Sequence, residues 1–459
     1  MYTISNRLKT FSIILIVLGV LGVAYGFMTS HKSLEEVKIM LADDGHGGGH
    51  DVPTEAHVVA GVENHADNTH DIGAHDATAD VDQGVHDDEH AAHVQERLAK
   101  RPWSAMYVAA FFFMMISLGV LAFYAINVAA QSGWSPLLNR VMEGISAYLL
   151  PGAIIVVAIA VGSHYIGHHN EIFIWMNPEV VADDKLIQNK SSYLNIPWFL
   201  IRAAIFIAGW VGYRHFARKF SIAQDTAEPG DKSNFKKSFR IAAGFLVFFI
   251  YTESIMSWDW VMSVDPHWFS TLFGWYVLSG MLVSGVTVIA MVAIFLKSLG
   301  HLPLVNDSHI HDLAKYMFGF SVLWTYLWFS QFMLIWYANI PEEVTYFVTR
   351  IEDYNLPFFG MLVLNFLFPL LILMNSDYKR IPWFVMMCGV LILVGHYVDI
   401  FVMIMPATVG DQWFIGIPEI GSILLFGGLF LLVVFSSLAK APLTVKNNPF
   451  LKESEHFHY

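Results

Sequence analysis

The chain has 459 residues, of which 55% are hydrophobic and only 14% are charged. A soluble globular domain is about one quarter charged, so this composition favours a membrane protein. The formal net charge is −13, but residues 41–96 hold fourteen Asp and Glu and no Lys or Arg. The rest of the chain is nearly neutral and has no basic patch, which argues against a nucleic-acid-binding role.

Ten apolar runs are long enough to cross a bilayer core, which takes about 20 residues of helix. They lie at about 10–29, 105–130, 140–163, 196–217, 238–262, 270–298, 311–339, 355–376, 381–404 and 415–437. The sequence therefore predicts an all-α polytopic membrane protein of about ten transmembrane helices. Residues 1–30 would hold the first helix, 101–440 a membrane body of nine helices, and 441–459 a tail.

The first run could be mistaken for a cleaved signal peptide, because Arg7 and Lys9 precede its apolar stretch. That stretch is long for a signal peptide, and no small-residue cleavage site follows it. We expect a retained helix.

Residues 31–100 form a long acidic segment with low hydrophobicity, expected to be either disordered or docked on a partner. Between residues 46 and 93 it carries nine histidines that could bind Zn or Cu. Their irregular spacing implies no rigid cage and favours a solvated, low-complexity segment. These histidines are His46, His50, His57, His65, His70, His75, His86, His90 and His93.

Orientation follows from Lys and Arg, which concentrate in the cytoplasmic loops of membrane proteins. Seven of them lie between the fourth and fifth runs: Arg214, Arg218, Lys219, Lys232, Lys236, Lys237 and Arg240. Counting outward from this loop predicts that both termini are cytoplasmic and that residues 31–100 lie outside. We expect a multi-pass protein of the bacterial inner membrane.

Ionisable side chains inside a membrane are costly, so each is a functional candidate. The candidates are Glu143, His164, Arg202, Glu253, Asp259, His396 and Asp399. A haem between two helices needs two histidines at matched depth, which His164 and His396 do not provide. The single cysteine, Cys388, can build neither a Cys-ligated cluster nor a haem attachment. We therefore expect no cofactor in this chain.

Glu253 lies near the middle of the fifth run, where burial favours the protonated carboxyl and a role in proton relay. The alternative is a structural acid that pairs with Arg202 or bonds within the bundle. Asp259 lies about 240° further around the same helix. His396 and Asp399 share a helix face, where the carboxylate would raise the basicity of the histidine. A structural hydrogen bond would show the same spacing.

His164, Arg202 and Trp260 are expected at one depth near the outer surface. They are candidates for a quinone pocket, since aromatic and polar groups at that depth suit a flat head group. The alternative is a set of interfacial anchors, which membrane proteins place at the same level.

Three segments carry a family resemblance: Tyr193–Arg202, Met256–Thr271 and Tyr326–Glu343. They resemble signatures of the NrfD/PsrC-like membrane subunits of alternative complex III, a bacterial quinol:cytochrome c oxidoreductase. The resemblance covers about residues 100–440 and is closest to the F-type subunit. It implies two four-helix bundles plus peripheral helices and no cofactor in the chain.

The resemblance also implies partners. These are a second NrfD-like subunit, a multihaem cytochrome c, an iron–sulfur protein, small membrane or lipoprotein subunits, lipid and an attached terminal oxidase. Haem c and iron–sulfur clusters would lie on the partners, and menaquinone is the expected quinone. In this family a proton-conducting or scaffolding role is proposed for the F-type subunit.

Three functions remain open from the sequence. The first is a cofactor-free subunit of a quinol-oxidising complex, with a proton path through Glu253, Asp259, His396 and Asp399. The second is a secondary transporter of metal ions captured by the His-rich segment. No run shows the paired Gly/Pro-interrupted helices or the clustered acids expected of an ion site at mid-membrane. The third is a structural scaffold whose polar groups only join helices.

Overall fold

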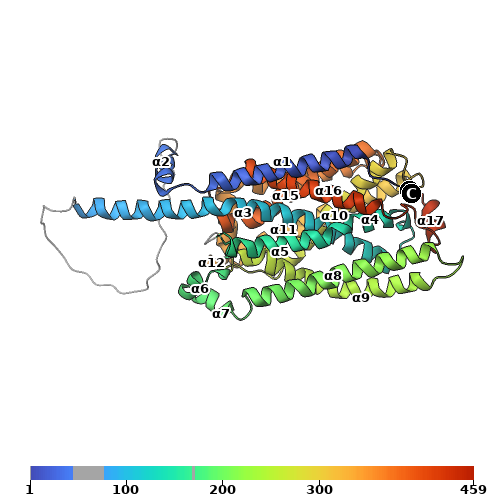
Figure 1. Ribbon diagram of the computed structural model, residues 1–459, viewed down its shortest axis with the longest axis horizontal. Coiled ribbons are helices and arrows are strands. Elements are labelled where there is room, and N and C mark those ends of the chain that lie inside the picture. The colour runs from blue at the N-terminus through green and yellow to red at the C-terminus, as the bar shows by residue number, and fades with distance from the viewer. Residues whose placement is uncertain (1, 45–76, 168–170, 459) are drawn as a thin grey trace.

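The computed structural model describes residues 2–44, 77–167 and 171–458. Within these ranges the secondary structure is helical and includes no strand. Ten helical segments of the described chain are long and apolar enough to cross a membrane. They run side by side along the long axis of the molecule (Figure 1). The chain is therefore an all-α polytopic membrane protein, as predicted.

The spanning segments include two that are interrupted. They are α1 (Asn6–Ser30), α3 (Ala77–Ala129), α4 with α5 (Asn139–Ile145 and Leu149–Tyr165), α8 (Ile196–Asp225), α9 (Ser233–Trp260), α10 (Phe273–Ser298), α11 (Asp307–Ala338), α13 with α14 (Asn355–Leu362 and Phe368–Leu373), α15 (Pro382–Val409) and α16 (Ile417–Leu438). The shorter helices are α2 (Leu34–Asp44), α6 (Pro178–Asp183), α7 (Lys185–Lys190), α12 (Pro341–Glu352) and α17 (Leu451–Glu455). A π-helical turn, Val363–Leu367, joins α13 to α14.

Polar caps set the ends of the helices. The Asn195 side chain accepts a hydrogen bond from the Trp198 amide at 2.9 Å, and Pro197 follows in the first turn of α8. Asn306 caps α11 in the same way. That helix ends at Asn339, which adopts a left-handed conformation with φ of 50°. Asparagine tolerates this conformation better than most residues.

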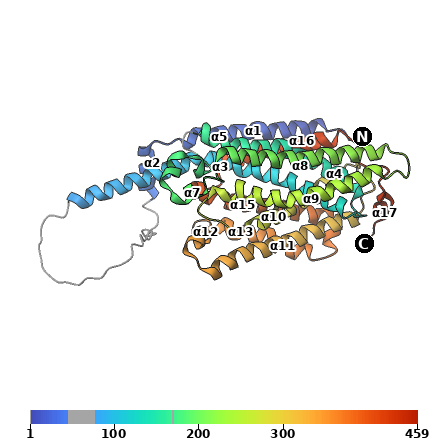
Figure 2. The same ribbon diagram turned by 90° about the horizontal axis from the view of Figure 1, so that it is seen from below.

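The spanning helices form two bundles, as the resemblance implies. We call α3, α5, α8 and α9 the first bundle, and α10, α11, α13 with α14, and α15 the second bundle. The helices α1 and α16 pack along each other and against α3. Figure 2 places α8 and α11 on opposite sides of the molecule. Contacts of α3 with α10 and α15 join the bundles.

Glycines bring α1 and α16 into backbone contact. A Cβ atom on Gly19 would lie 2.3 Å from the backbone nitrogen of Leu425. One on Gly22 would lie 2.8 Å from the Cα of Gly421. Small residues allow such close approach between helices in a membrane.

The acidic segment after α1 differs from the expected loop at both of its ends. The helix α3 begins at Ala77 and has 53 residues, which makes it about 80 Å long. It extends beyond the membrane body (Figure 1). The helix α2 packs on it through Val37, Ala91 and Val94. Residues 45–76, which hold most of the nine histidines, lie outside the described residues.

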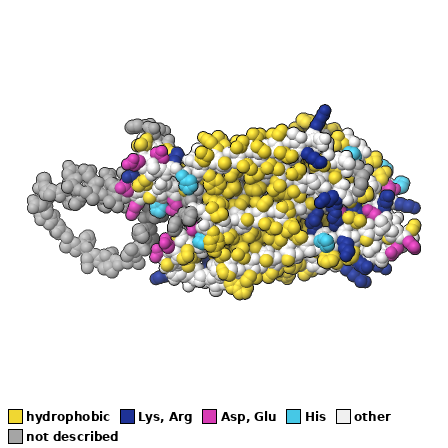
Figure 3. Space-filling model, in the orientation of Figure 1, with side chains coloured by type: hydrophobic (Ala, Val, Ile, Leu, Met, Phe, Trp, Pro, Cys, Tyr) yellow, Lys and Arg dark blue, Asp and Glu magenta, His cyan; other side chains and the backbone are white. Residues whose placement is uncertain are grey.

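Charge is distributed unevenly along the molecule. Hydrophobic side chains cover the middle, and Lys and Arg gather toward one end (Figure 3). Both chain termini lie at that end (Figure 2). The connection between α8 and α9 lies there too (Figure 1). Of the seven basic residues predicted for this loop, only Lys232 lies in the connection, and the other six belong to the adjoining parts of α8 and α9. We call this end of the molecule the basic end and the opposite one the outer end.

Candidate functional site

Glu253 lies on α9 with its carboxyl fully buried. One carboxyl oxygen is 3.5 Å from the Ser254 hydroxyl, and the other has no hydrogen-bond partner among the described residues. The alternative pairing with Arg202 is wrong, because Arg202 binds Asp259. The Ser257 hydroxyl, four residues further along α9, donates to the Ser254 carbonyl. Glu253 is thus a buried acid that forms no ion pair with any described residue.

Asp259 and Arg202 form a buried ion pair between α9 and α8. Arg202 Nε lies 2.5 Å from Asp259 Oδ2, and Nη2 lies 3.3 Å from Oδ1. The remaining Arg202 nitrogen donates to the Tyr193 carbonyl at 3.0 Å, and the guanidinium lies over the Tyr193 ring. Such two-point contacts fix both side chains and stabilise the charges in a low-dielectric setting.

The quinone-pocket candidates are each held by other groups. His164 Nδ1 is 3.2 Å from Glu171 Oε1. Arg202 uses all three of its nitrogens on Asp259 and Tyr193. The Trp260 ring is buried against Trp210, so it is not an interfacial anchor. His164 and Arg202 are thus bound to protein groups, whereas the Trp260 indole nitrogen has no hydrogen-bond partner among the described residues.

A second ionic cluster lies at the basic end of the first bundle. Arg140 donates to Glu143 Oε2 at 2.7 Å and to Asp225 Oδ2 at 2.5 Å. The Tyr124 hydroxyl donates to Glu143 Oε1 at 3.4 Å. Glu143 was among the predicted candidates, but Arg140 and Asp225 were not, because Arg140 is the first residue of its apolar run and Asp225 lies beyond the end of the fourth run. The i,i+3 spacing of Arg140 and Glu143 was the available signal.

The predicted pair on α15 lies in the centre of the second bundle. Asp399 accepts hydrogen bonds from the Tyr276 hydroxyl and, at 2.8 Å, from Trp324 Nε1. His396 Nδ1 is 3.5 Å from Asp399 Oδ2 but makes no hydrogen bond to it. Both ring nitrogens of this buried histidine lack a hydrogen-bond partner among the described residues. The two residues are neighbours, and other helices hold the carboxylate.

A small cavity adjoins Asp399 toward the outer end. It has a volume of about 10 Å³ and is also lined by Gln331 and Arg350, which leaves room for about one water molecule. Arg350, on α12, lies over the Tyr346 ring at 3.3 Å. The sequence analysis missed this arginine because it lies in a charged connection between apolar runs.

Asn365 is a further buried polar group of the second bundle. It lies in the π-helical turn, and neither its amide oxygen nor its amide nitrogen has a hydrogen-bond partner in the described chain. A Cβ on Gly395 would lie 2.1 Å from its oxygen, so Asn365 abuts α15 beside His396. Single π-helical turns often occur at functional positions. No sequence pattern marks this turn.

The predicted proton-path residues thus belong to two clusters. Glu253 and Asp259 lie in the first bundle, whereas His396 and Asp399 lie in the second. Among the described residues, no group of three or more His, Cys, Asp or Glu could hold a metal ion. His168 and His169 lie outside those residues, as do most histidines of the acidic segment.

Comparison with known proteins identifies no relative, since no protein-family model and no curated protein matches the chain.

Proposed function

We propose that the chain is an NrfD/PsrC-like membrane subunit of a quinol:cytochrome c oxidoreductase of the alternative complex III type. The electron carriers, haem c and iron–sulfur clusters, lie on partner subunits, and menaquinol is the electron donor of the complex. This subunit carries protons through its first bundle and supports the assembly. The sequence resemblance supports the membership, and the buried acids support the proton role.

The observation that carries the proton role is Glu253. Its carboxyl is buried in the membrane body with no cation beside it among the described residues. A permanent charge there would be very costly, and an apolar residue would serve better if the position were only structural. A neutral carboxyl with an open oxygen can accept and release a proton in turn. We therefore assign Glu253 the central transfer step.

Two paired acids lie on either side of Glu253. Asp259 is six residues further along α9, which is about 9 Å along the helix axis toward the outer end. Glu143 lies toward the basic end and is bound by Arg140 and Tyr124. Arg202 beside Asp259 and Arg140 beside Glu143 stabilise the negative charge of each carboxylate. Glu253 has no such cation among the described residues. Bound water would complete the connections between the three carboxyls.

The second bundle contributes a separate proton-exchange group. His396 and Asp399 lie side by side, and the small cavity near Arg350 adjoins the carboxylate. A histidine with two open ring nitrogens can take up a proton when water reaches it. This pair acts independently of Glu253, because the two groups belong to different bundles.

The test begins with the tagged chain purified from its native membranes in mild detergent. Reduced c-type haem bands in the optical spectrum would place it in a cytochrome-bearing complex, since this chain has a single cysteine and no haem attachment motif. A colourless, solitary polypeptide would refute the membership and favour a transporter.

The proton role is tested in that complex by Glu253→Gln, which keeps the shape of the side chain but cannot carry a proton. Quinol oxidation should continue while the proton-to-electron ratio falls. Ser254→Ala is the matched control, because it removes the hydroxyl at 3.5 Å and keeps the acid. An unchanged ratio in Glu253→Gln would leave only the scaffolding role.

A further inference from the structure

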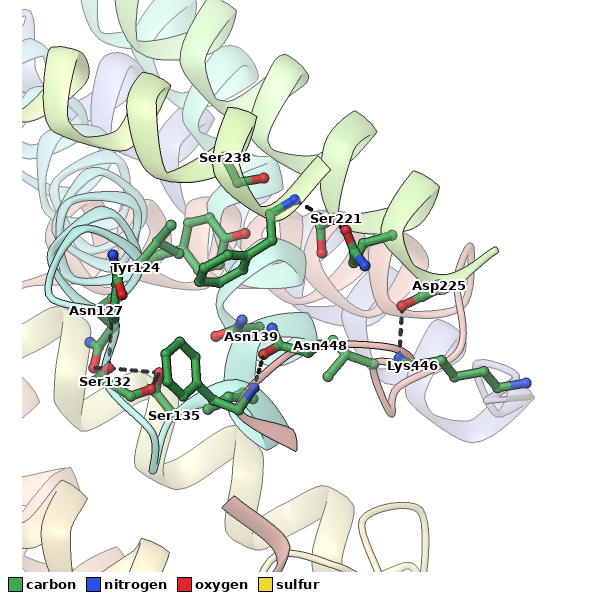
Figure 4. A pocket seen from close by; sticks show the side chains of 17 residues that line it. Tyr124, Asn127, Ser132, Ser135, Asn139, Ser221, Asp225, Ser238, Lys446 and Asn448 are labelled. Carbon is green, nitrogen blue, oxygen red and sulfur yellow. Dashed lines mark hydrogen bonds between the residues drawn. The ribbon is translucent and has the colours of Figure 1, made fainter. Parts of the chain in front are cut away.

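A polar cavity lies at the basic end of the first bundle (Figure 4). Its volume is about 40 Å³, enough for a few water molecules. The ends of α3, α8 and α9, the start of α4 and the C-terminal tail all contribute to its wall. Hydroxyl and amide groups predominate among the residues labelled in Figure 4.

The cavity contains an open hydrogen-bonding group. Asn139 is only 7% exposed, and its side-chain oxygen has no hydrogen-bond partner among the described residues. Nearby, the hydroxyls of Ser132 and Ser135 are 3.0 Å apart and line the same space. A buried amide oxygen without a partner is costly, and an ordered water molecule is its usual partner in a polar cavity. Asn139 therefore indicates bound water.

Tyr124 connects this cavity to the carboxylate of Glu143. Tyr124 lines the cavity, and its hydroxyl donates to Glu143 Oε1 at 3.4 Å. A phenol can accept a hydrogen bond from water while donating one to a carboxylate. Water in the cavity would thus be one hydroxyl away from Glu143.

The C-terminal tail forms one wall of the cavity and is hydrogen-bonded to the end of α8 and the residues that follow it. The backbone amide of Lys446 donates to Asp225 Oδ1 at 2.8 Å, and the Asn447 side chain donates to the Ala227 carbonyl at 2.8 Å. The other oxygen of Asp225 binds Arg140. Asp225 therefore joins the tail to the ionic cluster that holds Glu143.

We propose that this cavity is a water-filled vestibule that supplies hydrated protons to Glu143 through Tyr124, with tail residues 445–450 as its movable outer wall. This inference rests on the proposed proton role of the first bundle and identifies where protons enter it. The ligand is water and the hydrated proton, because hydroxyl and amide groups predominate in the lining beside the charged Asp225 and Lys446. Among the described residues, the Asn139 side-chain oxygen has no hydrogen-bond partner there.

The experiment measures water access with single cysteines in the full chain in its native membranes. Cys388 is first replaced by alanine, and Ser135→Cys then places a thiol in the vestibule. Ser117→Cys is the matched control, since Ser117 is buried on α3 and does not line the vestibule. A small, positively charged methanethiosulfonate is applied to inside-out and right-side-out vesicles, and mass spectrometry counts the modified thiols.

We expect Ser135→Cys to react at least about tenfold faster than Ser117→Cys in inside-out vesicles, because access requires only local opening of the tail. Adding Asn447→Ala, which removes tail hydrogen bonds, should raise that rate several-fold. Equal rates at the two positions would overturn the vestibule. Faster reaction in right-side-out vesicles would overturn its cytoplasmic side, and no effect of Asn447→Ala would overturn the tail as its wall.

This labelling does not depend on turnover. A reactive Ser135→Cys combined with an unchanged proton-to-electron ratio in Glu253→Gln would refute the proton role of Glu253 alone. An unreactive Ser135→Cys combined with a lowered ratio would refute the vestibule alone.

Discussion

Arg202 and Asp259 show how a single ion pair joins two helices of the first bundle. Asp259 is fully buried, so loss of Arg202 would leave its charge without compensation. We expect Arg202→Leu to lower the free energy of unfolding by roughly 3–5 kcal/mol, the usual effect of breaking a buried pair. Thermal unfolding in detergent would measure it.

The double variant Arg202→Leu/Asp259→Leu is the control for that prediction. It removes both charges, and apolar replacements of a buried pair are often neutral or stabilising. Most of the lost stability should therefore return. Equal losses in the single and double variants would show that packing, not the unpaired charge, sets the cost.

Asp184 carries a pH dependence outside the membrane body. Its carboxylate caps α7 through the Leu186 and Ile187 amides. The hydrogen bond with His267 and these amides lower the pKa of Asp184. Because the folded pKa lies below the unfolded value of about 3.9, the stabilisation is complete above that pH and is lost as pH falls through the folded pKa.

Hydrogen exchange of the Leu186 and Ile187 amides would measure this effect. In the natural chain, their protection should fall in the acid range below about pH 3.9. Asp184→Asn still caps the helix but does not titrate, so its protection should be independent of pH there. If the protection of these amides fell in the same acid range in Asp184→Asn, a group other than Asp184 would be responsible for the pH dependence.

At the scale of residues, the sequence predicted which ionisable groups are buried better than it predicted their partners. Spacing along one helix correctly placed His396 beside Asp399. The partner of Arg202 lies on another helix, and the rotation of that helix decided between Glu253 and Asp259. Asn365 could not be identified from the sequence as a buried polar group of the second bundle. Its position there depends on a local π-helical turn, which no sequence pattern marks.

At the scale of elements, α1 is held largely by its contact with α16. Gly19→Ala would place a Cβ 2.3 Å from a backbone atom of that helix, so the two must separate. We expect a loss of about 1–3 kcal/mol, the usual cost of overpacking. Gly212→Ala on α8 is the control, because nothing lies within 4 Å of its Cβ position. Equal thermal stability of the two variants would contradict the close contact.

The membrane spans were predictable because a bilayer demands a fixed apolar length, whatever the neighbouring helices do. The same criterion overlooks polar helices outside the bilayer. Residues 77–104 lack a long apolar run, yet all of them belong to α3, and α2 packs against the buried Ala91 and Val94 of that helix. Interruptions inside spans, such as the π-helical turn in the eighth, also leave hydropathy unchanged.

At the scale of the whole molecule, the basic end gives an expected orientation. Ten spans bring both termini to one end, where Lys and Arg also gather and where the α8–α9 connection lies. Cytoplasmic loops of membrane proteins are enriched in these residues. A green fluorescent protein fused after Tyr459 should therefore fluoresce, and alkaline phosphatase at that position should be inactive.

Alkaline phosphatase fused after Lys190, at the outer end between α7 and α8, should be active in the same cells. The reverse pattern would place Glu143 and its vestibule outside, and proton uptake would then begin at Asp259. Orientation thus decides which of the two paired acids receives protons first. The fusion experiment therefore shows which paired acid, Glu143 or Asp259, lies on the cytoplasmic side of Glu253. That result does not depend on whether a variant alters the proton-to-electron ratio.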